Sequence, residues 1–349
     1  MAFIDFDTII REAWNSYDSS REIAHIVDIS AKVSTNHVYR ISLKDKNFIV
    51  AKLSYFGKFE HFVEDHSIIN TLSNNLPSPF ENFLARSLMK GNKLFVHRYK
   101  SEIIDAWVVF YRPIHIKNKL PKRLNKNEIV KLAQQTAHFH KACDTVKATL
   151  PRSSKTMKDD VNDLLEILDD TSTKYEYPVH RDLIRDHCHL FLDNYKSLRG
   201  DELETIPVFV DWNIGNFSVT PNFKLFSRWD YDWFRMSTRM LDFYFFSRVA
   251  SDIGDKTVFS YNVDVMMEER FIIFLKAYHK IFPLSELEIR FLKESYRFFI
   301  LTYVIKYGRF FFHEIFATKL QKEALEIHLP TLDEKFDPEP LLNALDLNT

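Results

Sequence analysis

The stretch V-D-W-N-I-G-N, from Val210 to Asn216, carries the strongest indication of the fold of this chain. It places an acid, Asp211, five residues before an amide, Asn216, and it holds one of only 6 glycines among 349 residues. An acid that follows a strand can take a proton from a hydroxyl, and an amide oxygen is a ligand for a hard cation. Gly215 would let the backbone turn tightly between them. The same residue types also form Asx turns in hairpins, so this stretch alone leaves two interpretations open.

A second acidic stretch, W-D-Y-D-W at 229–233, follows a predicted strand. Asp230 and Asp232 would point the same way if the chain is extended there. Carboxylates at the end of a strand, beside an asparagine that itself follows an aspartate, are the ligands that phosphate-bound magnesium ions need. This stretch therefore favours a metal and phosphate site over a simple turn.

Lys52, in the predicted strand I-V-A-K-L, is a candidate to meet phosphate oxygens as a compact cation. The alternative is an outward lysine on a half-exposed strand. Glu64 and Asp65 lie on the next predicted helix, and either could pair with Lys52. Glu64 has the longer reach, whereas Asp65 is in phase with the apolar positions of the helix.

The periodicity of the chain predicts two unequal parts that meet at Pro113, because proline cannot continue a strand ladder. We expect a β-rich lobe over 1–113, a helical lobe over 114–349, and a ligand cleft between them. Strands are predicted at 38–43, 47–53, 93–99, 106–112, 208–211, 216–219 and 223–230, and helices at 59–73, 127–142, 156–170, 180–200 and within 238–327. The last twenty residues, Pro-rich and acidic, are predicted to be a loosely held tail.

Composition excludes several classes of function. A net charge of −1 gives no electrostatic case for binding nucleic acid. Two cysteines, Cys143 and Cys188, cannot build a disulfide framework, which fits a reducing compartment. The chain has no signal-peptide pattern and no apolar run of membrane-spanning length. We therefore expect a soluble cytoplasmic protein with neither a nucleic acid nor a membrane as its partner.

The order and spacing of these stretches resemble those of the aminoglycoside phosphotransferase and choline kinase family, relatives of protein kinases. F-V-D-W-N-I-G-N at 209–216 is similar to the catalytic loop H-x-D-x-x-x-x-N of that family, and W-D-Y-D is similar to its metal-binding motif. M-L-D-F-Y contains Asp242 where the family has a structural aspartate, and A-H-F-H-K-A contains the matching His140. The resemblance covers roughly residues 25 to 250. It implies an α+β, bilobal protein-kinase-like fold with a small β-rich N-lobe and a larger helical C-lobe.

The resemblance also implies roles for single residues. Asp211 would be the catalytic base, and Asn216 and Asp230 would hold Mg²⁺. Lys52 would contact the phosphates of ATP or another nucleoside triphosphate, braced by Glu64 or Asp65. The remaining nucleotide contacts would come from a phosphate-covering loop and from backbone groups around the adenine, supplied by Ser34, Thr35, Asn36, Phe110, Tyr111 and Arg112.

The acceptor implied by the resemblance is a hydroxyl of a small molecule, with amino sugars and amino alcohols as candidates. Such an acceptor would lie among the helices at 156–200 and those after 250. Acids that could receive its amine are Asp159, Asp160, Asp163 and Glu166.

Two departures from the family pattern leave an alternative open. Phe209 stands where the catalytic loop usually has a histidine, which braces the loop through hydrogen bonds. The nucleotide loop S-T-N-H at 34–37 contains no glycine, so its backbone approaches a phosphate less freely. The alternative is a pseudokinase, or a nucleotide-binding module without phosphotransfer activity.

Overall fold

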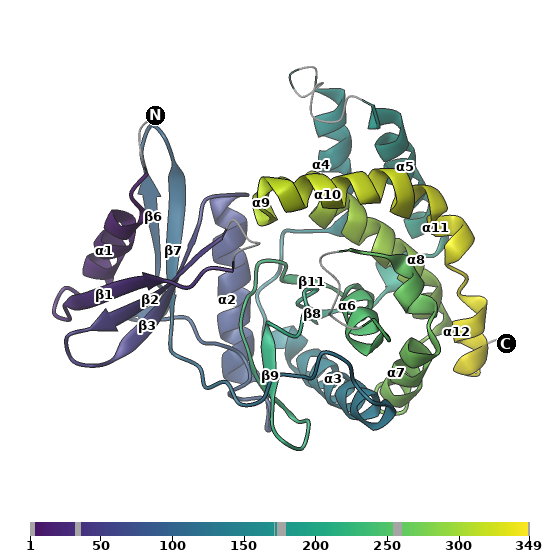
Figure 1. Cartoon of the computed structure of the whole chain (residues 1–349), viewed down its shortest axis with the longest axis horizontal. Helices are drawn as coiled ribbons and strands as arrows, with labels where there is room; N and C mark the ends of the chain where they lie inside the picture. Colours follow the sequence, from purple (N-terminus) through teal and green to yellow (C-terminus); the bar gives the residue numbers. More distant parts are fainter. Residues whose placement is uncertain (1–3, 32–35, 171, 173–178, 254–259, 348–349) are drawn as a thin grey trace.

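A five-stranded antiparallel sheet forms the first lobe, in the order β1-β2-β3-β7-β6 (Figure 1). The structure is a computed structural model that describes residues 4–31, 36–170, 172, 179–253 and 260–347. Both predicted hairpins form, although the second begins at Val96 because Lys93–Leu94 (β5) pairs with Met89–Lys90 (β4). The strands of the sheet are β1 (Ile23–Asp28), β2 (His37–Leu43), β3 (Phe48–Ser54), β6 (Val96–Lys100) and β7 (Asp105–Tyr111).

The sheet is covered by a helix on each face, so its central strands are apolar on both sides. In β7, Val108 and Phe110 pack into the cluster that contains Ile10 and Trp14 of α1 (Phe6–Tyr17). The alternate residue Trp107 lies against Phe59 and Phe62 of α2 (Phe59–Asn75). Successive side chains of a strand point to opposite faces. The same alternation turns Lys52 of β3 away from α1, on the side opposite Ala51 and Leu53, which pack against that helix.

Helix α2 joins the two lobes. It follows the sheet hairpin in sequence, but Ile68, Ile69 and Leu72 are buried in the large core of the helical lobe. Figure 1 shows α2 standing between the sheet and the helices. Its acid Asp65 lies in phase with this buried stripe, as the sequence predicted, and is 9% exposed. A residue on the cleft side of α2 can therefore contact both lobes.

The second lobe is helical, with two short β-ladders inside it. The predicted β island is present as two antiparallel pairs, although its first strand ends at Val208, three residues before the predicted end. These strands are β8 (Thr205–Val208), β9 (Phe217–Val219), β10 (Leu225–Arg228) and β11 (Arg235–Thr238). The helices are α3 (Lys126–Val146), α4 (Met157–Asp169), α5 (Arg181–Ser197), α6 (Met240–Ala250), α7 (Glu269–His279), α8 (Glu286–Phe299), α9 (Gly308–Phe311) and α10 (Glu314–Glu323), with a π-helical segment at Ile300–Lys306 between α8 and α9.

The prediction of a loosely held tail is wrong. Residues Leu329–Lys335 and Glu339–Ala344 form α11 and α12, which pack against the helical lobe. Leu341 and Leu342 are fully buried in the main core, so an apolar pair anchors this segment despite the prolines around it. Pro338 and Pro340 are tolerated because they lie at the N-cap and the second position of α12, where an N–H has no partner within the helix. Pro330 lies where a π-helical turn at Ala324–His328 passes into α11.

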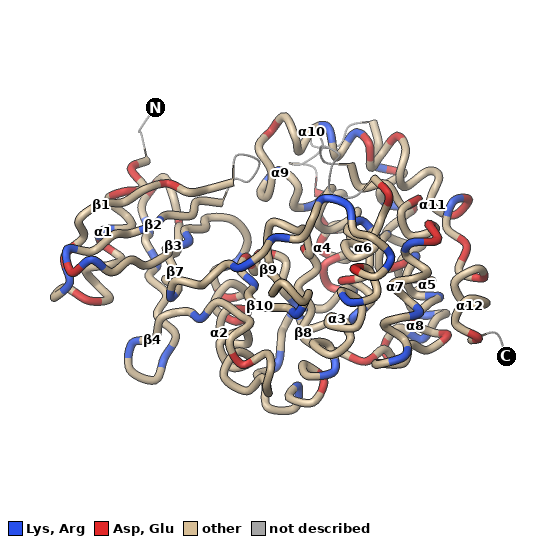
Figure 2. Tube along the Cα trace, turned by 60° about the horizontal axis from the view of Figure 1, so that its bottom comes forward, with Lys and Arg blue, Asp and Glu red and all other residues tan. Residues whose placement is uncertain are grey.

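Three further features concern apolar helices, the distribution of charge and the cysteines. Within the described ranges, no helix combines the length and the apolar character that a bilayer crossing requires. Basic and acidic residues are interspersed along the trace (Figure 2). Cys143 and Cys188 are both buried free thiols.

Candidate active site

The predicted catalytic loop leaves β8 through a strained turn. Val210 has φ +59°, a left-handed conformation that is rare for a β-branched residue. Asp242, at the beginning of α6, accepts hydrogen bonds from the backbone N–H groups of Phe209 at 3.0 Å and of Val210 at 2.6 Å. Its second oxygen lies 3.0 Å from Nε2 of the buried His140. Asp242, which the family pattern marked as structural, thus holds the strained turn in place together with its partner His140.

Phe209, which replaces the usual histidine, is buried, and the face of its ring contacts the cationic side chain of Arg228. The Arg228 guanidinium lies 4.7 Å from the centre of its ring and 4.2 Å from that of Trp212. Arg228 also donates to the backbone carbonyl of Asp211 at 2.9 Å. Arg228 and Asp242 together provide the bracing that the histidine would supply, so Phe209 does not leave the loop unsupported.

Asp211 and Asn216 contact each other across the loop. The Asn216 amide donates to Asp211 Oδ2 at 2.8 Å, and the Asn213 N–H donates to Asp211 Oδ1 at 3.2 Å. Burial, together with the nearby charge of Asp230, raises the pKa of Asp211 to about 6. Such a carboxylate is ionised at neutral pH and is a better proton acceptor than an ordinary aspartate.

Gly215 does not serve the purpose that the sequence suggested. Its φ is not positive, and a Cβ at this position would meet no atom within 4 Å. The positive φ values near the site belong instead to Val210 and Asp230, at 59° and 67°. Non-glycine residues in such conformations cluster at functional sites.

Asn216 and Asp230 fit a hard divalent cation. The Trp229 N–H donates to the Asn216 carbonyl at 3.0 Å and so brings Asp230 beside Asn216. Because the amide nitrogen of Asn216 faces Asp211, its side-chain oxygen accepts no hydrogen bond from the described residues. An amide oxygen and a carboxylate, completed by phosphate and water, are the ligands that Mg²⁺ prefers. Among the described residues, no cluster of three or more His, Cys, Asp or Glu side chains forms a metal cage of protein groups alone.

Lys52 reaches this site but does not pair with either acid of α2, so that prediction is wrong. Its ammonium lies 3.0 Å from Asp230 Oδ1 and also contacts Asp232. Asp65 instead accepts from Lys155 at 2.6 Å, and Glu64 accepts from the Ser153 hydroxyl at 2.7 Å. Residues of the linker before α4 therefore bind both acids of α2. Asp232 pairs with Lys52 in place of the α2 acid that the resemblance implied.

One cation, Lys52, faces the two carboxylates of Asp230 and Asp232 within a small volume. The Lys52 side chain is 6% exposed, whereas that of Asp230 remains 40% open to solvent. Although enclosure in the cleft disfavours its charged form, Lys52 holds the pKa of Asp230 below its usual range. Burial raises the pKa of Asp232 above its usual range, opposed by Lys52.

The remaining predicted nucleotide contacts are only partly described. Ser34 and Thr35 lie outside the described residues, whereas Asn36 is buried and donates to Asp232. The backbone groups of Phe110 and Arg112 already pair within the fold: Leu88 N–H donates to the Phe110 carbonyl at 2.7 Å, and Arg112 N–H donates to Arg86 at 2.9 Å. Tyr111 is buried, and its hydroxyl lies 2.5 Å from His66 Nε2. Their contact with adenine stays a prediction.

The side chains predicted to act in catalysis and metal binding line a small cavity of about 130 Å³. Its lining includes Asp211, Asn216, Asp230, Asp232 and Asn36. A larger cavity of about 660 Å³ adjoins it, and Asp232 and Phe311 line both. This larger cavity receives three of the four acids predicted to meet an acceptor amine, Asp160, Asp163 and Glu166. The fourth, Asp159, lies in the first turn of α4, where its carboxylate accepts from the hydroxyl of Thr156, the N-cap residue.

Sequence reasoning gave no role to Lys155, and it assigned Asn36 to the phosphates without indicating its contact with Asp232. The spacing W-D-Y-D indicated that Asp232 would lie beside Asp230, and it does. The contacts of Asn36 and Lys155 bridge residues 196 and 90 positions apart, a separation that no local pattern encodes.

Comparisons of the whole chain place its fold among those of small-molecule kinases. An amicoumacin kinase, solved with AMP-PNP, Ca²⁺ and Ami, matches with a TM-score of 0.62 at 11% identity, over 97% of each chain. A microcompartment-associated aminopropanol kinase matches with a TM-score of 0.58 at 15% identity, over 98% of this chain and 99% of that one. The GDP complex of aminoglycoside 2'-phosphotransferase-IIIa matches with a TM-score of 0.56 at 13% identity, over 95% of this chain and 100% of that one.

The sequence itself has no such match, since neither the protein-family models nor the curated proteins searched include one. The structural matches show that the chain has the bilobal protein-kinase-like fold that the motifs predicted. The resemblance to aminoglycoside phosphotransferases is confirmed at the level of the fold.

Proposed function

We propose that this chain is an ATP- and Mg²⁺-dependent phosphotransferase that acts on a hydroxyl group of a small molecule. The observation that carries the proposal is the convergence of Asp211, Asn216 and Asp230 on one small cavity, with Lys52 ion-paired to Asp230. These residues come from β3, from the loop after β8 and from the loop after β10. Phosphoryl transfer needs this combination, because positioning and neutralisation of charge supply most of its catalysis.

In this proposal, Asp211 orients the acceptor hydroxyl and takes its proton. The acceptor oxygen forms a bond to the γ-phosphorus, and the bond from that phosphorus to the bridging oxygen breaks, with its electron pair remaining on the leaving diphosphate. Lys52 contacts the phosphate oxygens and is held in place by Asp230 and Asp232. Mg²⁺, when bound by Asn216 and Asp230, would neutralise the charge on the phosphates.

The larger cavity is the proposed acceptor site. It adjoins the catalytic cavity, and α4 contributes to its wall three acids, Asp160, Asp163 and Glu166. These acids support an acceptor with an amine, such as an amino sugar or an amino alcohol. The buried free thiols of Cys143 and Cys188 fit an activity in the cytoplasm.

A pseudokinase is the second candidate, and one observation favours it. Lys52 is engaged by two carboxylates at once, and a triphosphate would have to share it with both. A pseudokinase would bind nucleotide without turnover.

The test is phosphate release or transfer from Mg-ATP in the presence of hydroxylated amines, with wild-type protein and with Asp211→Asn. We expect turnover by the wild type and a loss of at least 100-fold in the variant, while nucleotide binding persists. Unchanged turnover by the variant excludes Asp211 as the base. Nucleotide binding without turnover for any acceptor in the wild type favours the pseudokinase.

A further inference from the structure

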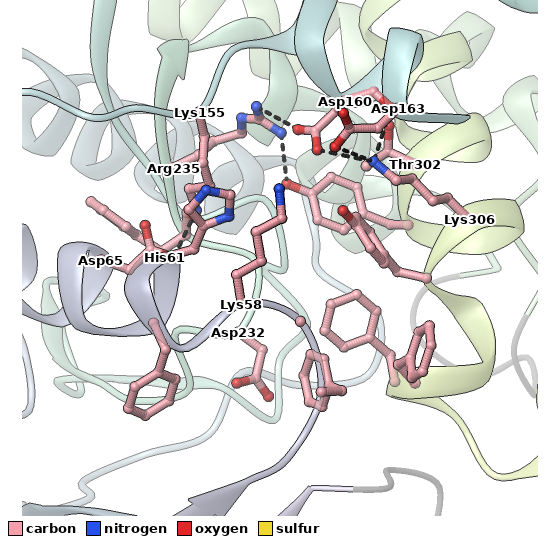
Figure 3. A pocket seen from close by; sticks show the side chains of 18 of the residues that line it. Lys58, His61, Asp65, Lys155, Asp160, Asp163, Asp232, Arg235, Thr302 and Lys306 are labelled. Carbon is pink, nitrogen blue, oxygen red and sulfur yellow. Dashed lines mark hydrogen bonds and ion pairs between the residues drawn. The ribbon is translucent and has the colours of Figure 1, made fainter. Parts of the chain in front are cut away.

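The larger cavity lies where α2, α4 and the π-helical segment Ile300–Lys306 approach one another. Its volume of about 660 Å³ lies within the range of sites that hold drug-sized ligands. Phe56, Phe310 and Phe311 give it an aromatic side that can pack against the body of a ligand. Its charged side chains converge from several elements (Figure 3). Their signs therefore indicate what kind of molecule it takes.

Among the described residues, four cationic side chains line the cavity, and three of them are paired. Lys155 contacts Asp65, Arg235 contacts Asp160, and Lys306 contacts both Asp160 and Asp163. The fourth, Lys58, has no ion pair or hydrogen bond to any residue in the described ranges. Figure 3 shows its side chain extending into the cavity toward Arg235. Of the described lysines and arginines in the cavity, Lys58 therefore lacks a counter-ion and is available to an anionic group of a ligand.

Two buried charged groups in the wall are only partly satisfied. Within the described residues, Asp65 Oδ1 and Arg235 Nε have no hydrogen-bond partner. Asp65 is 9% exposed and Arg235 is 2% exposed, so water reaches them poorly. A carboxylate oxygen only accepts and a guanidinium N–H only donates. A buried polar group without a partner is destabilising, so a ligand that supplies the partner gains affinity. One group requires a donor from the ligand, and the other requires an acceptor.

We propose that the acceptor is a zwitterion, a hydroxylated compound with both a protonated amine and an acidic group. The amine would lie toward Asp65, Asp163 and Glu166, and the acidic group toward Lys58 and Arg235. Glu166, like Lys58, has no partner among the described side chains, so each end of the ligand finds an uncompensated charge. This proposal rests on the proposed function and deepens it, because it adds a negative group to the amine that the acids of α4 favour.

The test compares matched ligands that differ by one charge. The probes are hydroxy amino acids and seryl or threonyl dipeptides, each as the parent zwitterion, as the N-acetyl derivative and as the methyl ester. Binding is measured by calorimetry in the presence of AMP-PNP and Mg²⁺. We expect at least one parent to bind, and about tenfold weaker binding after the loss of either charge, as for a hydrogen bond to a charged group.

The variant Lys58→Met locates the negative end of the ligand. We expect it to weaken the parent zwitterion about tenfold and to leave its methyl ester unchanged. Lys131→Met, which removes another exposed lysine outside the cavity, is the control and should change neither. Because Lys58 has no side-chain partner within the described part of the chain, we expect the variant to keep the fold, which its melting temperature verifies.

Three results would overturn the zwitterion proposal. These are equal binding of the esters and the parents, binding of the N-acetyl forms alone, and no binding by any probe. None of them contradicts phosphotransfer itself, because turnover of a purely cationic acceptor with Mg-ATP would leave the proposed function intact. Failure of the proposed function has a separate sign, which is the absence of Mg-ATP turnover with any acceptor, cationic ones included.

Discussion

At the scale of single residues, Lys52 is the group whose surroundings differ most from expectation. Its ammonium contacts Asp230 and Asp232, whereas both acids of α2 are engaged elsewhere. Removing one member of a buried ion pair leaves an uncompensated charge, which costs about 3–5 kcal/mol. The pairing can therefore be measured as a coupling energy.

A double-mutant cycle between Lys52→Met and Asp232→Asn should give a coupling of about 1–3 kcal/mol in the free energy of unfolding. The matched cycle between Lys52→Met and Asp65→Asn should give a coupling near zero, because Asp65 pairs with Lys155. Urea unfolding of the single and double variants measures both cycles. A larger coupling to Asp65 than to Asp232 would contradict the arrangement described above.

Asp65 predicts a pH dependence of stability. Burial raises its pKa to about 6 in the folded protein, above the ordinary value of 3.8 that it has when unfolded. Between these values the folded state keeps a proton that the unfolded state has released. The contribution of Asp65 to the free energy of unfolding therefore decreases as the pH rises from about 4 to 6. Above pH 6 it no longer changes with pH. Asp65→Asn should remove this slope.

The difference in unfolding free energy between Asp65→Asn and wild type should shift in favour of the variant by about 3 kcal/mol between pH 4 and 7. Denaturant unfolding of both proteins at pH 4, 5, 6 and 7 measures it. Glu60→Gln, on the exposed side of the same helix, is the control and should follow the wild type. Parallel curves for Asp65→Asn and wild type would show that Asp65 has an ordinary pKa.

At the scale of elements, the beginning of α6 fixes the catalytic loop. Asp242 accepts from two backbone N–H groups next to Asp211 and contacts His140 of α3. Asp242→Ala would leave both buried N–H groups unpaired, at about 1–3 kcal/mol each. We expect a destabilisation of about 3 kcal/mol and a loss of turnover beyond what the fraction unfolded explains. Asp186→Ala, on the exposed face of α5, should stay within about 0.5 kcal/mol of wild type.

The predicted elements that the structure confirms are those whose local sequence has a regular hydrophobic periodicity. The hairpin of β2 and β3 and the helices α2, α3, α4 and α5 lie within a few residues of their predicted bounds. The helix α1 was not predicted, although its signals are local. Asp5 caps its first turn, and Ile9, Ile10, Ala13 and Trp14 form one buried stripe. The acidic start of the chain was interpreted only as the absence of a signal peptide.

Other features could not come from local pattern. The contact of Lys52 with Asp230 joins residues 178 positions apart, and two other acids satisfied the same spacing argument. The choice depended on Lys155 and Ser153, which come from a linker without any motif. Likewise Gly215 suggested the strained turn, whereas the strain lies at Val210, where packing and Asp242 impose it.

At the scale of the whole molecule, the last helix completes the core of the helical lobe. Leu342 of α12 is fully buried in that core. Leu342→Ala should destabilise the protein by about 2–5 kcal/mol, as large-to-small changes in a core do. Leu347→Ala, at a partly buried position near the end of the described chain, should cost less. Thermal unfolding compares the two. Equal melting temperatures for Leu342→Ala and wild type would restore the interpretation of this segment as a loose tail.

The central claim is that the cleft between the lobes binds a nucleotide through Lys52 and a metal through Asn216 and Asp230. The most direct test is thermal unfolding with and without Mg-ATP, for the wild type and for Asp230→Asn. A ligand that binds only the folded state adds about 2.7 kcal/mol at 100 times its dissociation constant. We predict that Mg-ATP stabilises the wild type and that the variant loses the magnesium-dependent part of the shift. The absence of a shift with any nucleotide, in the presence or absence of Mg²⁺, would contradict the account.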